Sequence, residues 1–286
     1  MYKETLKEEP MNTLKIAMIQ MKVEFHEAEK NLEHAACLVK EATFRGADIC
    51  VLPECMDLGW GTPKARELAH TIPGKTSDAL CNIARENHVY IVSGITERAG
   101  EDIYNTALLI SDEGKILGKH RKINVLTGVE DVYSIGDRLS VITTPLGKIG
   151  FDICADNSIQ SLSIGYTLAR MGAQIILSPS AWAVTPDRDP VKEPYGREWH
   201  APYSLLSGTF GIPVIGVSNV GHVKDGSWEG WKAIGNSIAY DRHGKLLTVL
   251  PYGEDAECIE VIDVSLGEAN ILGTALSEAI YEKQHS

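Results

Sequence analysis

The stretch of sequence that decides the fold is Lys148–Asn157, which reads KIGFDICADN. Its apolar part, Ile149–Ile153, predicts a buried strand, and the polar, turn-prone residues Ala155 to Asn157 follow at once. Cys154 is therefore expected at the C-terminal end of a strand, where open α/β sheets bind their ligands. Taken by itself, this thiol could equally be a small core residue, because free cysteines are often buried for packing.

A second strand ends in the same way near the N-terminus. Leu14–Met21 predicts a buried strand, Glu27–Gly46 an amphipathic helix, and Ala47–Leu52 (ADICVL) another buried strand that runs into Glu54. This β-α-β opening favours parallel strands joined by a right-handed crossover. Glu54 therefore comes just after a predicted buried strand, as Cys154 does.

The rest of the chain alternates between strand and helix patterns, with no linker and no short-period repeat. Further helices are predicted at 76–87, 159–171 and 197–209, and further strands at 89–96, 104–111, 115–119, 139–144, 173–178, 212–219, 235–240, 246–250 and 258–264. We expect one α/β domain over residues 11–270, with two sheets or one large mixed sheet covered by helices. Residues 1–10 are predicted to be a solvated extension, and the amphipathic tail 271–286 could exchange onto a partner subunit.

Composition indicates the cellular compartment and excludes some classes of binding partner. The net charge of −12, from 27 basic and 39 acidic residues, argues against nucleic acid and anionic membranes as partners. The six cysteines form no CxxC pair, which indicates reduced thiols and argues against structural zinc. The first residues, MYKETLKEEP, lack the apolar core of a signal peptide, and no apolar run approaches the roughly 20 residues that span a bilayer. We therefore expect a cytoplasmic protein.

Three side chains at strand ends have the chemistry of a thiol hydrolase. A thiol that attacks a carbonyl or nitrile carbon needs a base, and a cation or N–H donors where negative charge develops. Glu54 suits the base if it is partly desolvated, Lys122 supplies a cation, and the backbone N–H of Ala155 is a further donor beside Cys154. The plainer alternatives are a solvated loop glutamate and, for the run Lys119–Lys122, a solvated basic face.

The order of three motifs, LPE, HRKIN and FDICADN, resembles the nitrilase, or carbon–nitrogen hydrolase, superfamily. The likeness extends from the opening LKIAMIQ to the late segment GNSIAYDRHGKLL and includes YNTALLISDEGKILGKHRK. It implies a four-layer αββα sandwich, a homodimer packed through helices, and covalent thiol catalysis without metal or organic cofactor. Carried over by position, it implies Glu54 as base, Lys122 as oxyanion stabiliser and Cys154 as nucleophile.

The resemblance also implies roles for residues around this triad. Glu130, in TGVEDVYS, corresponds to a second glutamate that positions the lysine or the substrate; the alternative is a solvated loop carboxylate. The segment SPSAW points to Trp182 as a pocket wall with Trp60 opposite, although both indoles could serve ordinary packing. Asp156, in Cys-Ala-Asp, resembles the amidase and carbamoylase branches rather than the nitrile-hydrolysing branch, and we include it among the substrate-binding candidates.

The hypothesis is therefore hydrolysis of a non-peptide carbon–nitrogen bond. A small amide or N-carbamoyl (ureido) compound would be cleaved to an acid and ammonia or an amine through a thioester on Cys154. Hydrolysis of a small nitrile by the same triad is the close alternative. Two further alternatives are a Cys-His hydrolase of protease type, with His120, His200 or His222 as base, and a catalytically silent binding protein on the same scaffold.

Overall fold

Two six-stranded sheets form the centre of the computed structural model, which describes residues 13–267. The predicted extension (1–10) and tail (271–286) lie outside the described residues. In spatial order, the first sheet contains β15 (Cys258–Ser265), β1 (Thr13–Gln20), β2 (Ile49–Val51), β3 (Tyr90–Ala99), β4 (Asp102–Ile110) and β5 (Ile116–Arg121). The second contains β14 (Leu246–Val249), β13 (Ile238–Tyr240), β10 (Val214–Ser218), β8 (Ile175–Ser180), β7 (Gly147–Phe151) and β6 (Val141–Thr144).

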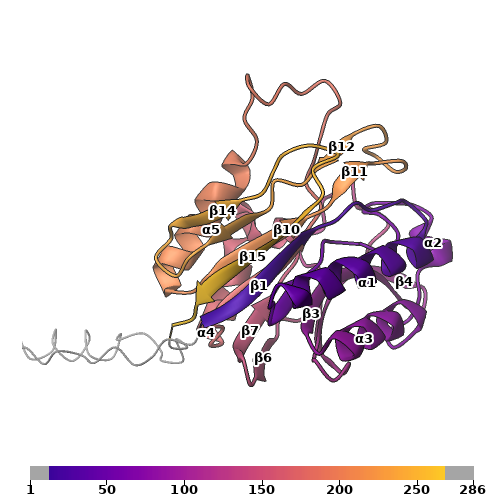
Figure 1. Ribbon diagram of the computed structural model, residues 1–286. Coiled ribbons are helices and arrows are strands. Elements are labelled where there is room, and N and C mark those ends of the chain that lie inside the picture. The colour runs from indigo at the N-terminus through magenta and orange to yellow at the C-terminus, as the bar shows by residue number, and fades with distance from the viewer. Residues whose placement is uncertain (1–12, 268–286) are drawn as a thin grey trace, which may run out of the picture.

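Helices cover the outer face of each sheet. Helices α1 (Ala28–Phe44) and α3 (Lys75–Asn87) pack on the first sheet, and α4 (Leu162–Arg170) and α5 (Arg197–Phe210) pack on the second. Figure 1 shows α1 and α3 on one side of the paired sheets and α5 on the other. The predicted four-layer αββα sandwich is therefore confirmed. None of the helices within residues 13–267 is long and apolar enough to cross a membrane.

Strand alternation explains why two apolar layers form. Successive side chains of a strand point to opposite faces of its sheet. In β1, Ile16 and Met18 face the second sheet and share one core with Phe151 of β7, whereas Ala17 and Ile19 belong to the core beneath α1 and α3. A strand that is covered on both faces needs apolar side chains on both faces, and β1 has this pattern.

Strand direction gathers several strand ends at one edge. Strands β1, β2 and β3 are parallel, β4 is antiparallel to β3, and β5 is antiparallel to β4. The carboxyl ends of β2 and β5 and the start of β4 therefore meet at the same edge. In the second sheet β7, β8 and β10 are parallel, and the N–H of Glu54 donates to the carbonyl oxygen of Ser180 at 3.1 Å. This bond joins the corresponding edges of the two sheets.

A small third sheet was not predicted from the sequence. It contains β11 (Val220–His222), β12 (Lys232–Ile234) and β9 (Ala183–Val184), where we expected loops. Strands of two or three residues are too short for an alternating pattern to be recognised. The helix α2 (Ala65–Leu68) was also missed, because four residues are too few to show a helical period. The helix predicted at 159–171 consists of a short 3₁₀ helix (Ile159–Ser161) followed by α4.

Candidate active site

Cys154 lies three residues after the end of β7 and starts a 3₁₀ turn (Cys154–Asn157) in a left-handed backbone conformation, with φ of +47°. Such a conformation costs a non-glycine residue about 1–3 kcal/mol and persists only where the surroundings hold it. Here the N–H of Cys154 donates to Oγ of Ser178 on β8 at 3.1 Å. The turn lifts the thiol off the sheet, and 6% of the residue remains exposed to a cavity.

The thiol is neutral at rest. Burial and the negative charge of Glu54 raise the pKa of Cys154 well above its ordinary value. The charge of Lys122 and a hydrogen bond from the backbone of Ala181 offset only part of this rise. Because the thiolate is the reactive form, attack by Cys154 requires a base that takes the proton during the reaction.

Glu54 lies fully buried at the end of β2. Burial raises the pKa of Glu54 to about 7, the charge of Lys122 opposes this rise, and the charge of Glu130 adds to it. Its Oε2 has no hydrogen-bond partner within the described residues, which leaves that atom able to accept a proton. The neighbouring strand approaches so closely that a Cβ at Gly94 would lie 2.6 Å from Cα of Glu54, so only glycine fits at that position.

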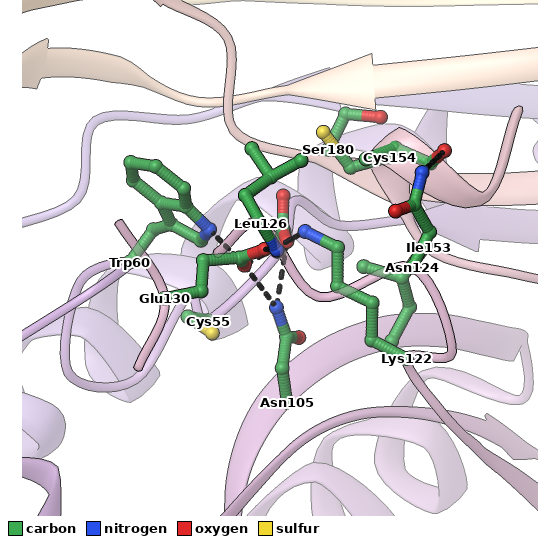
Figure 2. A network of polar contacts seen from close by, with 12 residues as sticks. Cys55, Trp60, Asn105, Lys122, Asn124, Leu126, Glu130, Ile153, Cys154 and Ser180 are labelled. Atoms are coloured by element: carbon green, nitrogen blue, oxygen red, sulfur yellow. Dashed lines mark hydrogen bonds and ion pairs between the residues drawn. The ribbon is translucent and has the colours of Figure 1, made fainter. Parts of the chain in front are cut away.

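Lys122 lies between two buried carboxylates. Its Nζ is 2.8 Å from Oε1 of Glu54 and 2.7 Å from Oε1 of Glu130, and all three side chains are inaccessible to solvent. Asn105, at the start of β4, donates through Nδ2 to Oε1 of Glu54 at 2.6 Å, and Trp60 donates through Nε1 to Oε1 of Glu130 at 2.5 Å. Figure 2 shows the side chains of Trp60, Asn105 and Lys122 converging on Glu130.

The charges in this network determine its protonation. Burial acts to lower the pKa of Lys122, but Glu130 and Glu54 outweigh it and hold the pKa well above its ordinary value. The other oxygen of Glu130 accepts a hydrogen bond from the N–H of Leu126 at 2.8 Å, which holds this carboxylate in place. The arrangement thus combines a fixed cation, a carboxylate with a raised pKa and a thiol.

Asp156 does not line the cavity, and we therefore withdraw it as a substrate contact. It is fully buried, and its Oδ2 accepts hydrogen bonds from Nε2 of His120 at 2.8 Å and the N–H of Ile153 at 3.1 Å. Its Oδ1 accepts bonds from the N–H groups of Ile123 at 3.1 Å and Asn124 at 2.7 Å. Asp156 therefore ties the segment after Lys122 to the turn of Cys154.

We expect Asp156→Asn to lower the free energy of unfolding by about 3 kcal/mol, because an amide N–H₂ would face buried donors and leave them unpaired. Chemical denaturation monitored by circular dichroism measures this loss. Asp137→Asn, which changes a carboxylate with 77% of its side chain exposed, is the matched control and should shift stability by less than about 0.5 kcal/mol. Equal stability of both variants would show that the buried bonds of Asp156 contribute little.

A cavity of about 550 Å³ opens above the thiol. Cys154 and Ala155 line it, as do Trp60 and Trp182, the two predicted pocket walls, whereas Glu54, Lys122 and Glu130 lie buried behind it. The lining also includes four aromatic residues that sequence reasoning missed: Tyr195, Trp199, Trp228 and Trp231. Asn105 was missed as well, although YNTALLI begins a predicted strand at the same sheet edge.

The three histidines named for a Cys-His hydrolase do not reach this cavity. His120 is buried against Asp156, His200 pairs with the hydroxyl of Tyr240 at 2.8 Å, and His222 is exposed on β11. No histidine lines the cavity among residues 13–267. Within that same range, no cluster of three or more His, Cys, Asp or Glu side chains could hold a metal ion.

Comparisons with known proteins agree with this geometry. Residues 15–270 match the family model described as carbon–nitrogen hydrolase. The mouse omega-amidase NIT2 is 35% identical over 185 residues, which cover 61% of this chain and 66% of the mouse protein. A nitrilase from Pyrococcus abyssi is 36% identical over 173 residues, which cover 58% of this chain and 64% of the relative. These matches span about two thirds of each relative's length.

Solved structures show the same fold. Nit3 from Saccharomyces cerevisiae, a member of the nitrilase superfamily, superposes with a TM-score of 0.76 at 26% identity, covering 89% of this chain and 90% of that chain. An amidase from Nesterenkonia sp. superposes with a TM-score of 0.73 at 18% identity, covering 96% of this chain and 97% of that chain.

Proposed function

The chain belongs to the carbon–nitrogen hydrolase family of the nitrilase superfamily, and we propose that it hydrolyses a small amide or ureido compound through a thioester on Cys154. One observation carries the proposal. Lys122 lies within 2.8 Å of the buried carboxylate of Glu54, and the charges of both act on the thiol of Cys154 at the wall of a cavity. These contacts support the proposal that Glu54 is the base, Lys122 the cation and Cys154 the nucleophile.

The first half of the reaction forms the thioester. Glu54 takes the proton of the Cys154 thiol as sulfur attacks the amide carbonyl carbon, and the carbonyl oxygen becomes negatively charged. The ammonium group of Lys122 and the N–H of Ala155 stabilise that oxyanion. The carbon–nitrogen bond then breaks, Glu54 returns the proton to the leaving nitrogen, and ammonia or an amine departs.

The second half returns the enzyme to its starting state. A water molecule attacks the thioester carbon, Glu54 takes its proton, and the same oxyanion stabilisation operates. The carbon–sulfur bond breaks, the sulfur regains the proton, and a carboxylic acid leaves. Glu130 forms a second ion pair with Lys122, which helps to keep the ammonium group protonated and in place.

The omega-amidase relative supports the amide branch, and the nitrilase relative supports a nitrile as the alternative substrate for the same triad. A silent binding protein has no use for a buried base and cation beside a thiol. The carbamoylase activity, the homodimer and the cytoplasmic location implied by the sequence stay predictions.

The test is ammonia release by the wild-type protein from a panel of small amides, ureido acids and nitriles, together with the intact mass of the protein during turnover. We expect release from amides or ureido acids and a mass increase equal to the acyl group. Release from nitriles only would overturn the choice of branch. No release and no acyl adduct with any compound would overturn the proposed function.

A further inference from the structure

All five tryptophans of the 286-residue chain line the cavity above Cys154. They come from four separate segments: the loop after β2 (Trp60), the end of β8 (Trp182), α5 (Trp199), and the connection between β11 and β12 (Trp228, Trp231). Trp60 and Trp182 are buried, but the other three are only half-buried. Core packing therefore accounts for the first two and leaves the other three without an explanation.

The indole rings are arranged in ordered pairs. Trp182 and Trp199 stack with centroids 5.1 Å apart and planes 18° apart, and Trp228 and Trp231 stack at 4.1 Å and 13°. Trp60 lies 4.9 Å from Trp228 with its plane tilted by 56°. Flat rings that already stack on one another offer their remaining faces and edges to a further flat ring entering the cavity.

The two charged side chains of the lining, Arg188 and Glu198, have opposite signs, and Arg188 is engaged by neighbouring groups. Arg188 donates to the carbonyl oxygens of Glu193 at 3.1 Å and Pro194 at 3.3 Å, and its guanidinium lies 5.4 Å from the ring centroid of Tyr195. Glu198, which has the opposite sign, is exposed in the first turn of α5. Apart from these two side chains the lining carries no charge, and its large side chains are mostly aromatic.

From these observations we infer that the group attached to the scissile carbonyl of the substrate carries a neutral aromatic ring. This inference rests on the proposed function and narrows it to arylalkyl amides or their ureido equivalents. The 550 Å³ cavity is far larger than an amide group needs, and its size lies within the range of pockets that bury a whole small molecule. The amide would meet Cys154 while the ring lies among the indoles.

The experiment compares four amides of similar size: phenylacetamide, cyclohexylacetamide, hexanamide and the cationic 6-aminohexanamide. Cyclohexylacetamide matches the carbon count of phenylacetamide without its flat ring. We expect kcat/KM for phenylacetamide to exceed that for cyclohexylacetamide by about 2-fold to 12-fold, because aromatic pairs are stabilised beyond their buried area. Equal values for the two would overturn the inference, and so would a preference for the cationic amide, which also suits indole faces.

Two variants locate the effect. Trp228→Leu should bring the ratio of the two kcat/KM values close to one, whereas Phe44→Leu, an aromatic residue 93% exposed at the end of α1, should leave the ratio unchanged. An unchanged ratio in Trp228→Leu would contradict the assignment of these walls. Thermal unfolding of both variants distinguishes a lost fold from a lost preference.

Binding to Cys154→Ala separates this inference from the proposed function. Quenching of tryptophan fluorescence should show tighter binding of phenylacetamide than of cyclohexylacetamide without turnover. If the wild-type protein hydrolyses all four amides equally, the aromatic preference is wrong and the proposed function stands. If it hydrolyses none while Cys154→Ala binds phenylacetamide selectively, the proposed function is wrong and the aromatic site stands. Failure of both would overturn both.

Discussion

Replacing Cys154 by alanine should abolish hydrolysis, with a loss in kcat of about 10⁵-fold or more. Without the sulfur no thioester forms, and the buried base and cation have no nucleophile to assist. Steady-state ammonia release with the best substrate of the panel measures the loss, and intact mass should show no acyl adduct. The fold should survive, because alanine is smaller and Cys154 packs at a cavity wall rather than in a closed core.

The matched control is Cys81→Ala. Cys81 is also a free thiol, but it is half-buried on α3, which packs on the outer face of the first sheet and takes no part in the site. This variant should keep wild-type kcat. Retention of more than about 1% of activity in a folded Cys154→Ala protein would refute the covalent mechanism, because hydrolysis without the cysteine nucleophile is expected to be far slower than this.

The fold could be predicted because it depends on local patterns, and the three proposed reacting groups were selected by the resemblance of their motifs to the carbon–nitrogen hydrolases. Apolar segments that end shortly before Glu54 and Cys154 mark strand ends, whereas Lys122 follows the charged run Lys119–Arg121, and parallel strands present their carboxyl ends at one edge. The end of β5 also lies at this edge. Because β4 is antiparallel to β3 and β5 is antiparallel to β4, β5 runs in the same direction as β3. A predicted hairpin at 104–119 already contained that information.

The rest of the site depends on contacts between distant segments. Trp228 and Trp231 lie on a loop between two strands of the third sheet, and strands of two or three residues leave no periodic signal, whereas Trp199 comes from α5, which packs on the second sheet. Asp156 was included among the substrate-binding candidates because Cys-Ala-Asp resembles the amidase and carbamoylase branches, but its oxygens accept hydrogen bonds from His120 and from the backbone after Lys122. Sequence proximity to a nucleophile does not determine which way a side chain points.

Glu54→Gln should lower kcat by about 10³-fold while leaving the fold intact. Glutamine has nearly the same shape, and its carbonyl oxygen can still accept bonds from Nζ of Lys122 and Nδ2 of Asn105, so the loss reports on the proton transfer itself. Glu130→Gln is the matched control, because it also removes one negative charge beside Lys122. If Glu54 is the base, Glu130→Gln should cost far less, about 10-fold to 100-fold, whereas equal losses would assign both carboxylates to holding the lysine.

The pH dependence of the wild-type protein tests the same assignment independently. Burial raises the pKa of Glu54 to about 7, and only the ionised carboxylate can accept the thiol proton. kcat/KM should therefore fall tenfold per pH unit below about pH 7, which gives the pH profile an acidic limb. If the base were a solvent-exposed glutamate, this acidic limb would begin near the ordinary pKa of about 4.3.

A second buried carboxylate must be separated from Glu54 in this profile. Burial and the charge of Asp156 raise the pKa of Asp152 to about 7 as well. Asp152→Asn should keep the acidic limb, because Asp152 takes no part in the proton transfer, and the residual activity of Glu54→Gln should lack it. If the acidic limb persists in Glu54→Gln and disappears in Asp152→Asn, the titrating group is Asp152. That result would contradict the assignment of Glu54 as the base.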